Sequence, residues 1–214
     1  LWQLLKESVP YKDDLELLCV TNNFQNIKVA IKCFLTGENA ESFFVYPTTL
    51  DLHELINSVK VLGFERLEEK YSKCAQKAYE TATATENGQL SDIIIDSAAL
   101  VMLQKYAADC KEKSVSRALA FIADSSNIKI AFRCAATNKD ISFIEEAISV
   151  CRHLDRQRLI DCCLTGFDAV LSYLKSTQYS EGAEIYNSYK LWVYPKAEAQ
   201  ISEEEIVLEK ERVF

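Results

Sequence analysis

One motif occurs twice in this chain and constrains its fold more than any other feature. The sequence N-I-K-V-A-I-K-C-F-L-T over 26–36 is echoed by N-I-K-I-A-F-R-C-A-A-T over 127–137. Six residue types are identical at matching places, and Lys32 is matched by Arg133. The second copy lies 101 positions after the first, which is too long for a two-helix solenoid repeat. The spacing predicts two copies of a module of several helices.

A shorter echo downstream indicates the same organisation. The pattern L-x-x-x-R-L over 62–67 recurs over 154–159, with an offset of 92 positions. Between the copies, the segment 81–88 reads TATATENG, lacks an apolar stripe and ends in Asn-Gly, which favours a boundary. We therefore predict a first helical module with a truncated start over 1–88, a second over 89–176 and the remnant of a third over 177–214.

Apolar residues recur at steps of three and four along most of the chain, which is the spacing of one buried helical face. The chain has only five Gly and three Pro, fewer than a sheet protein with many tight turns needs. Only 190–194 suggests an extended stretch. The predicted fold class is all-α. The predicted stripes are Phe24–Phe34, Leu67–Ala78, Leu100–Cys110, Ile141–Cys151 and Leu159–Val170.

Several polar residues stand where a helix would begin. Ser and Thr followed three residues later by an acid form capping boxes, and Asp before a periodic segment caps a helix or faces its dipole. The predicted helix starts are Ser142 with Glu145, Ser202 with Glu205, the weaker case of Thr48 with Asp51, Asp155 and Asp96.

Charge and hydropathy exclude two classes of partner. The formal net charge of −8 opposes the phosphate contacts that drive nucleic-acid binding, so we expect no nucleic acid. The longest apolar runs are far shorter than the roughly 20 residues that cross a bilayer, so we expect no membrane span. No signal peptide is visible, although the chain does not begin with Met.

The eight cysteines form no C-x-x-C pair and no cluster with histidine, so we expect no zinc site. We interpret them as reduced, mostly buried thiols of a reducing compartment. His153 would point away from Cys151 on a helix, and the sequence contains no phosphate loop, nucleophile elbow or dinucleotide fingerprint. We predict no catalytic residue, no metal and no cofactor.

The repeated motif supplies the candidate interface residues. Each copy places two basic residues one helical turn apart, where like charges repel by a few tenths of a kcal/mol. That repulsion indicates either acidic neighbours or an exposed face that receives a partner. The motif's asparagines cap a helix, bond a neighbouring connection or contact a ligand. The partner-interface candidates are Asn26, Lys28, Lys32, Asn127, Lys129 and Arg133.

The two motif copies, over 15–32 and 125–134, resemble the N-[IL]-K helices of the C subunit of bacterial and archaeal V-type and A-type rotary ATPases, a relative of the eukaryotic V-ATPase d subunit. Asp92 and Asp96 also resemble the spaced aspartates with which members open their second module. The resemblance covers roughly 10–175. It implies three helical modules arranged as a funnel around a pseudo-threefold axis.

The resemblance also implies a function. The family links the central shaft to the membrane rotor ring, transmits torque and performs no chemistry. The implied partners are the shaft subunits and the rotor ring, and the implied location is cytoplasmic, peripheral at the cytoplasmic face of a membrane. The six interface candidates would then face the funnel wall or lumen near the shaft.

This sequence departs from the family in having only two copies of the motif, with a tail too short for a complete third module. Two other functions therefore stay open. A helical-repeat scaffold that binds proteins would also show repeats without catalytic motifs. A thiol enzyme using Cys162 or Cys163 would need an accessible cysteine of low pKa.

Overall fold

The computed structural model describes residues 12–85 and 87–183, and these form α-helices and short 3-10 helices without a strand. The prediction of an all-α fold is confirmed. The longest helices are α2 (Lys12–Thr36), α4 (Glu69–Thr85), α5 (Gly88–Asp109) and α6 (Lys113–Ala136). The possible extended stretch at 190–194 and the capping box at Ser202 lie outside the described residues. The pseudo-threefold funnel stays a prediction.

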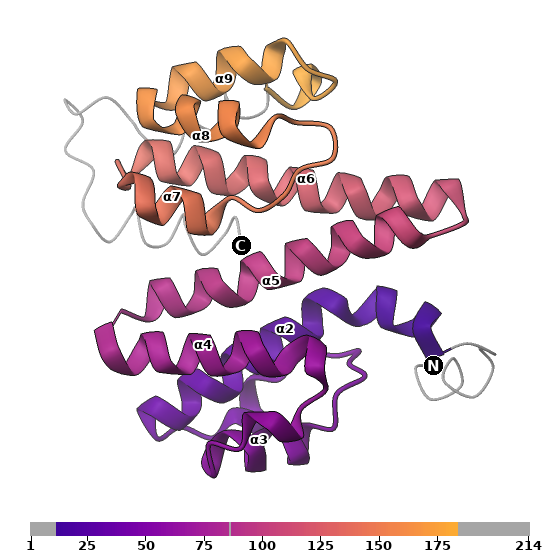
Figure 1. The fold of residues 1–214 in the computed structure, drawn as a ribbon, viewed down its shortest axis with the longest axis vertical. Helices are drawn as coiled ribbons and strands as arrows, with labels where there is room; N and C mark the ends of the chain where they lie inside the picture. Colours follow the sequence, from indigo (N-terminus) through magenta and orange to yellow (C-terminus); the bar gives the residue numbers. More distant parts are fainter. Residues whose placement is uncertain (1–11, 86, 184–214) are drawn as a thin grey trace.

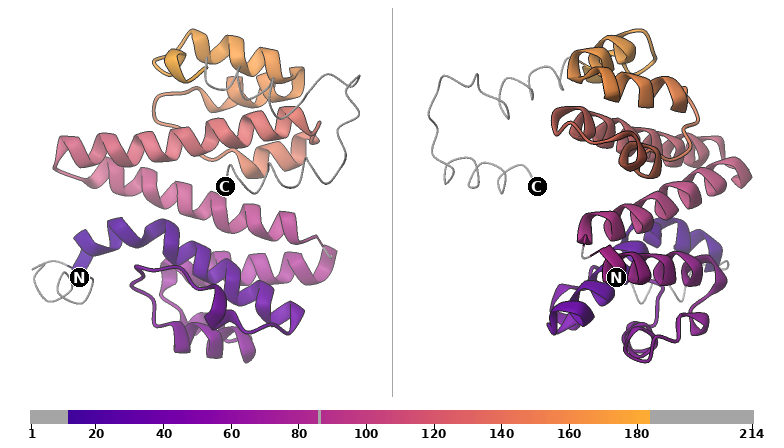
Figure 2. Two further views of the ribbon diagram at one scale, coloured as in Figure 1. Left: turned by 180° about the vertical axis from the view of Figure 1, so that it is seen from behind. Right: turned by 60° about the vertical axis from the view of Figure 1, so that its left-hand side comes forward.

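Helix α5 occupies the middle of the described fold. It packs against α2 and α4 on one side and against α6 on the other, as both the front view (Figure 1) and the rear view (Figure 2) display. Helix α3 (Leu52–Lys60) packs on α2. Two 3-10 turns lie in the connections on either side of α3: η1 (Ala40–Phe43) between α2 and α3, and η2 (Phe64–Arg66) between α3 and α4. After α6 the chain continues into α7 (Ile141–Ala147), which packs against both α5 and α6, and then into α8 (Arg156–Thr165) and α9 (Phe167–Lys175), which pack on α6.

The apolar core consists of two clusters. The first is built by α2, α3, α4, α5 and the N-terminal half of α6, ending at Ala123. The second begins at Ile128 and continues through α7, α8 and α9 to Ala183. Helix α6 therefore contributes to both clusters, and α5, which follows the predicted boundary at residue 88, packs into the core of the elements before it.

The structure corrects several predicted helix starts. Asp155 does cap α8, accepting a hydrogen bond from the Arg158 amide at 3.0 Å. Helix α7 is capped by Asp140, whereas the Ser142 hydroxyl only donates to the Asp140 carboxylate. The other corrections are that Asp51 rather than Thr48 caps α3, and that Asn87 caps α5 while Asp96 lies inside it. A sequence rich in Ser, Thr and Asp offers several competing caps within one turn.

Two predicted helical stripes are interrupted. The predicted stripe runs from Ile141 to Cys151, but the helix that begins at Ile141 ends at Ala147. Beyond it, the α6 side chains of Asn127 and Asp124 accept hydrogen bonds from the backbone amides of Ser149 and Arg152, which therefore do not continue the helix. The stripe from Leu159 to Val170 is split at Gly166, whose φ of 126° ends α8 and precedes α9. Such a φ is almost confined to glycine.

The L-x-x-x-R-L echo does not mark equivalent local structure. Arg66 belongs to η2 and Leu67 follows it as a cap, whereas Arg158 and Leu159 lie within α8. The first copy of the pattern also begins at Leu62, in a turn with a φ of 55°. The N-I-K motif is a better guide, since both of its copies lie in the C-terminal halves of long helices, α2 and α6.

Candidate functional site

The two lysines of the first motif copy bind acidic residues of α5. The Lys28 ammonium lies 2.6 Å from an oxygen of Asp96, and the Lys32 ammonium lies 2.7 Å from an oxygen of Asp92. The order of the pairs is reversed because α2 and α5 run in opposite directions. We call these four residues the α2–α5 ion-pair ladder. Of the two readings of the basic pair, acidic neighbours are therefore observed in this copy.

The ladder adds orientation more than stability. The Lys28 side chain is only 13% exposed, but those of Asp96 and Lys32 are each 50% exposed. Exposed ion pairs contribute between zero and about 1 kcal/mol because water and salt screen them. Two pairs one turn apart nevertheless fix the register between the helices, since a shift of either helix would break both.

The basic residues of the second copy lie on α6, on the other side of the ladder's acids. Lys129 is exposed, and Arg133 lines a pocket of about 320 Å³ together with Asp92 and Asp96. The second carboxylate oxygen of Asp92 is buried and has no hydrogen-bond partner within the described ranges. The structure thus gathers three candidates, Lys28, Lys32 and Arg133, around the first half of α5.

The motif's asparagines hold connections between helices. The Asn26 amide donates to the Val45 carbonyl at 3.0 Å and accepts from the Val45 amide at 2.8 Å. Asn127 likewise donates to the Val150 carbonyl at 3.3 Å and accepts from the Ser149 amide at 2.9 Å. Both asparagines are fully buried. They therefore bond a neighbouring connection, which was one of the roles predicted for them.

A second polar position, three residues before each asparagine, was missed by the sequence analysis. In α2 it is Asn23, which accepts from the Thr48 hydroxyl and the Thr49 amide and donates to the Tyr71 hydroxyl at 2.9 Å. In α6 it is Asp124, at the same offset of 101 as the motif. A buried polar residue at the same place in both copies of an apolar stripe was the signal that could have revealed the pair.

Asp124 is a fully buried carboxylate surrounded by donors. One of its oxygens accepts from the Gln104 amide at 3.0 Å and from the Arg152 backbone amide at 2.9 Å. The other accepts from the His153 backbone amide at 3.1 Å and the Tyr179 hydroxyl at 2.8 Å, with the His153 ring Nδ1 at 3.0 Å. Burial and the bond to Asp124 raise the pKa of Tyr179.

The connections held in this way present apolar side chains to solvent. Asn22, Asn23 and Asn26 together bind the backbone or hydroxyls of 45–49, and within that segment Tyr46 is 68% exposed. In the second copy, Val150 is 57% exposed beside the residues bound by Asn127 and Asp124. We call 43–49 and 148–153 the braced connections. Holding the backbone that carries an exposed apolar side chain lowers the entropy lost when the segment binds a partner.

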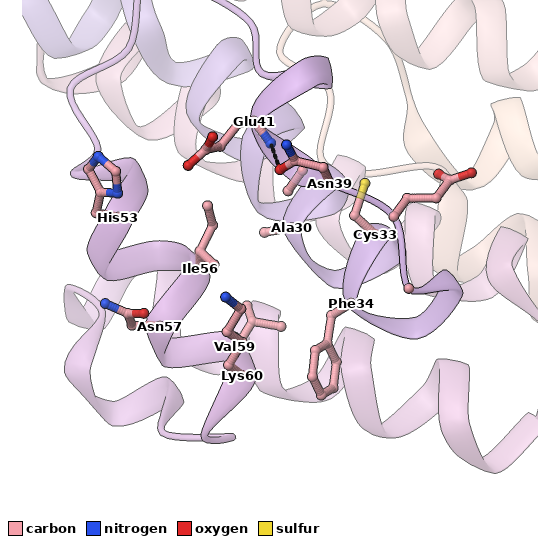
Figure 3. Close-up of a pocket in the computed structure, with 13 residues that line it drawn as sticks. Ala30, Cys33, Phe34, Asn39, Glu41, His53, Ile56, Asn57, Val59 and Lys60 are labelled. Atoms are coloured by element: carbon pink, nitrogen blue, oxygen red, sulfur yellow. Dashed lines mark hydrogen bonds between the residues drawn. The ribbon is translucent and has the colours of Figure 1, made fainter.

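A pocket of about 360 Å³ lies between the C-terminal end of α2, η1 and α3 (Figure 3). Ala30, Ile56 and Val59 supply apolar lining, while Glu41 and His53 stand at another part of its wall. The backbone amide of Glu41 donates to the Asn39 side chain at 3.2 Å, which shapes the turn at η1. Across 12–85 and 87–183, no group of three His, Cys, Asp or Glu residues is placed to hold a metal ion.

The thiols do not resemble activated nucleophiles. None of the eight cysteines, all of which lie in the described ranges, is in a disulfide, and Cys19, Cys33, Cys134 and Cys163 are buried. Burial raises the pKa of Cys163 to about 12 and also raises the pKa of Cys162. Cys151 stands in the connection 148–153 rather than on a helix, and burial there raises its pKa to about 12, with Asp124 adding to the rise. A thiol enzyme needs the opposite shift.

Comparison with known proteins gives the family. A family model described as ATP synthase (C/AC39) subunit matches residues 2–212. The chain is also similar to the C subunit of the V-type sodium ATPase of Enterococcus hirae, with 20% identity over 181 residues that cover 85% of this chain and 55% of the relative. It thus spans about half the length of that relative. No solved structure gives a significant match. None of the helices in the described ranges is both long and apolar enough to cross a membrane. Because the family model covers nearly the whole sequence, the protein belongs to the ATP synthase (C/AC39) subunit family.

Proposed function

We propose that this chain acts as a non-catalytic central-stalk subunit of a V-type ATPase or ATP synthase. In this role it links the rotor shaft to the membrane rotor ring and transmits torque between ATP turnover and ion translocation. The match of the family model over residues 2–212 carries the proposal. The proposed location is the cytoplasmic face of a membrane, reached through the partners rather than through a span of its own.

The packing of the helices is suited to transmitting force. Helix α5 contacts α2, α4 and α6, and α6 contributes to both apolar clusters, so these parts cannot move independently without opening a core. Protein interiors are close-packed and resist compression. The α2–α5 ladder adds two charge contacts across the same junction.

We assign partner contact to the braced connections rather than to the motif residues themselves. Asn26 and Asn127 then act as positioning residues, since Asn26 holds the backbone of Val45 next to Tyr46, and Asn127 holds the backbone of Ser149 and Val150. Tyrosine is enriched among the residues that dominate binding energy at protein interfaces. The exposed side chains of Tyr46 and Val150 would then contact apolar surface on the shaft or ring subunits.

The test is a pull-down of the full chain with purified shaft subunits and, separately, purified rotor ring of a V-type ATPase. Binding to either partner supports the stalk role, and failure to bind both would refute it. Tyr46→Ser and Val150→Ser are each expected to weaken one of these contacts at least tenfold. Val61→Ser is the matched control, because Val61 is 58% exposed and lies outside both braced connections.

The two parts of the proposal fail separately. If the unmodified chain binds and all three variants bind equally well, the stalk role stands and the assignment of the braced connections is wrong. We also propose that the subunit has no active site. The raised thiol pKa values support this, since they disfavour the thiolate that a thiol enzyme would use.

A further inference from the structure

The pocket between the C-terminal end of α2, η1 and α3 exposes apolar surface to water. Its floor is formed by buried residues, among them Ala30 and Val59. Phe34 also lines the pocket but is 40% exposed, and Phe43, at the end of η1, is 54% exposed. Exposed apolar side chains that border a cavity are typical of a surface that receives a partner.

The segment that builds most of this pocket is acidic. Between Lys32 and Lys60 the chain has four acids and neither lysine nor arginine. Two of these acids, Glu38 and Glu41, line the pocket and are exposed. Among the described residues, neither carboxylate takes part in an ion pair. Burial and, second, the charge of Glu38 raise the pKa of Cys33, so the field of this carboxylate reaches the pocket wall.

The two walls of the pocket differ in charge. Glu41 lies on η1, whereas His53 and Lys60 lie along α3 (Figure 3). Within 12–85 and 87–183, Lys60 forms no ion pair either, so the two walls do not neutralise each other across the opening. The wall formed by the end of α2 and by η1 therefore attracts a cation from outside the chain.

We propose that this pocket binds a basic amphipathic helix of another protein. An apolar side chain of that helix enters the pocket and packs on Phe34, Ile56 and Val59. A lysine or arginine one turn away on the same helix binds Glu38 and Glu41. Residues one turn apart lie on the same side of a helix, so a single helix supplies both contacts. This inference goes beyond the proposed stalk function and does not rest on it, because the residues that line the pocket lie outside the braced connections.

The size and the charge of the pocket favour this occupant over others. Its volume of about 360 Å³ is at the lower end of the range of about 300–1,000 Å³ in which proteins bind small ligands. It therefore admits a large side chain rather than a folded surface. The acidic wall repels an anionic membrane, and a second copy of this chain, with a net charge of −8, is also repelled.

The first experiment measures binding of a model helix to the full chain by fluorescence anisotropy. The probe is a fluorescein-labelled, end-blocked peptide of leucine and lysine in which the leucines recur at helical spacing. We expect saturable binding that weakens at least tenfold when serine replaces leucine, and about fivefold when glutamine replaces lysine. Absence of saturable binding, or equal affinity for the glutamine peptide, would overturn the proposal.

Variants of the chain test whether the pocket is the site. Glu38→Gln combined with Glu41→Gln should weaken binding of the leucine–lysine peptide about fivefold. The matched control combines Glu54→Gln with Glu65→Gln, which removes the same charge from exposed residues outside the pocket. Equal weakening by both pairs would show a general charge effect and refute the specific site.

Filling the pocket tests the apolar contact separately. Asn57 is exposed on the pocket wall, so Asn57→Trp should occupy the space and weaken peptide binding at least tenfold. Circular dichroism checks that this variant keeps the helix content of the unmodified chain. A folded Asn57→Trp variant that binds the peptide as tightly as the unmodified chain would contradict the proposal.

Photo-cross-linking locates the bound peptide directly. One leucine of the probe is replaced with photo-leucine, whose carbene inserts into neighbouring bonds on irradiation, and the labelled residues are identified by mass spectrometry. Insertion at Phe34, Ile56 or Asn57 supports the proposal, whereas insertion confined to other parts of the chain overturns it. None of these experiments includes the shaft or ring, so their failure is distinct from failure of the stalk function.

Discussion

Replacing Asp124 with asparagine tests how the second braced connection is held. At the equivalent place in α2, Asn23 has partners that can accept as well as donate, because the hydroxyls of Thr49 and Tyr71 can rotate. Around Asp124 the two backbone amides of Arg152 and His153 can only donate. An asparagine in α6 therefore cannot copy the one in α2.

The magnitude follows from the bonds. Suppose that the amide nitrogen of the asparagine replaces the carboxylate oxygen that now binds Tyr179 and His153. The amide could then donate to the Tyr179 hydroxyl and to the His153 ring. The His153 backbone amide would lose its acceptor, at a cost of about 1–3 kcal/mol. The remaining bonds would lose their charge assistance, while the cost of burying a charge would disappear. We expect Asp124→Asn to lower the free energy of unfolding by about 2 kcal/mol, and Asp124→Ala by about 4 kcal/mol.

The assay is urea unfolding at 25 °C followed by far-ultraviolet circular dichroism. With a slope of about 2 kcal/mol per M, a loss of about 2 kcal/mol moves the midpoint down by about 1 M. Asp161→Asn is the control, because Asp161 is exposed and its side chain accepts from the Gln157 amide at 3.1 Å. A midpoint for Asp124→Asn within about 0.2 M of the unmodified chain would refute the argument that the His153 backbone amide needs the carboxylate as its acceptor.

Three further outcomes are expected. Gly166→Ala should cost about 1–3 kcal/mol of unfolding free energy, because the φ of 126° strains any side chain, whereas Gly182→Ala should cost under about 1 kcal/mol. Asn26→Ala should cost about 2 kcal/mol in the same urea assay, since it frees both backbone groups of Val45. Stability should fall as pH rises above about 9, because burial holds the pKa of Cys163 at about 12 while the unfolded thiol ionises near 9. Unfolding midpoints between pH 8 and 11 measure this, and Cys163→Ser should flatten the slope.

The sequence predicted the helices better than their ends. Apolar spacing identifies a helix because it reports the face that becomes buried, and α2, α4 and α5 appear where such stripes were found, whereas α6 was indicated by the second copy of the motif. Ends depend on local competition for backbone amides. The stripe from Ile141 continues in sequence to Cys151, but Asn127 and Asp124 take the amides of Ser149 and Arg152 and the helix stops. Such a contact, more than 20 residues away, is invisible to local patterns.

The candidate site was predicted in part for a similar reason. The repeat correctly selected Asn26 and Asn127 as related residues, and the repulsion between Lys28 and Lys32 correctly raised the possibility of acidic neighbours. Asn23 and Asp124 were missed because the two copies differ there in residue type. A comparison of residue types between the two copies finds only positions that carry the same residue. A comparison of burial also finds Asn23 and Asp124, which differ in type but both bind the backbone of a connection.

The repeats in sequence and the units of packing do not coincide. The predicted boundary at residue 88 falls between α4 and α5, yet α5 completes the core built by α2, α3 and α4. The first cluster extends to Ala123, and the second begins at Ile128 on the same helix. The first predicted module, 1–88, therefore shares its core with α5, the first helix of the second predicted module. This interlocking opposes independent motion, because separating two modules would expose apolar surface at roughly 25 cal/mol per Å². Such stiffness is what a subunit needs if it passes rotation from one partner to another.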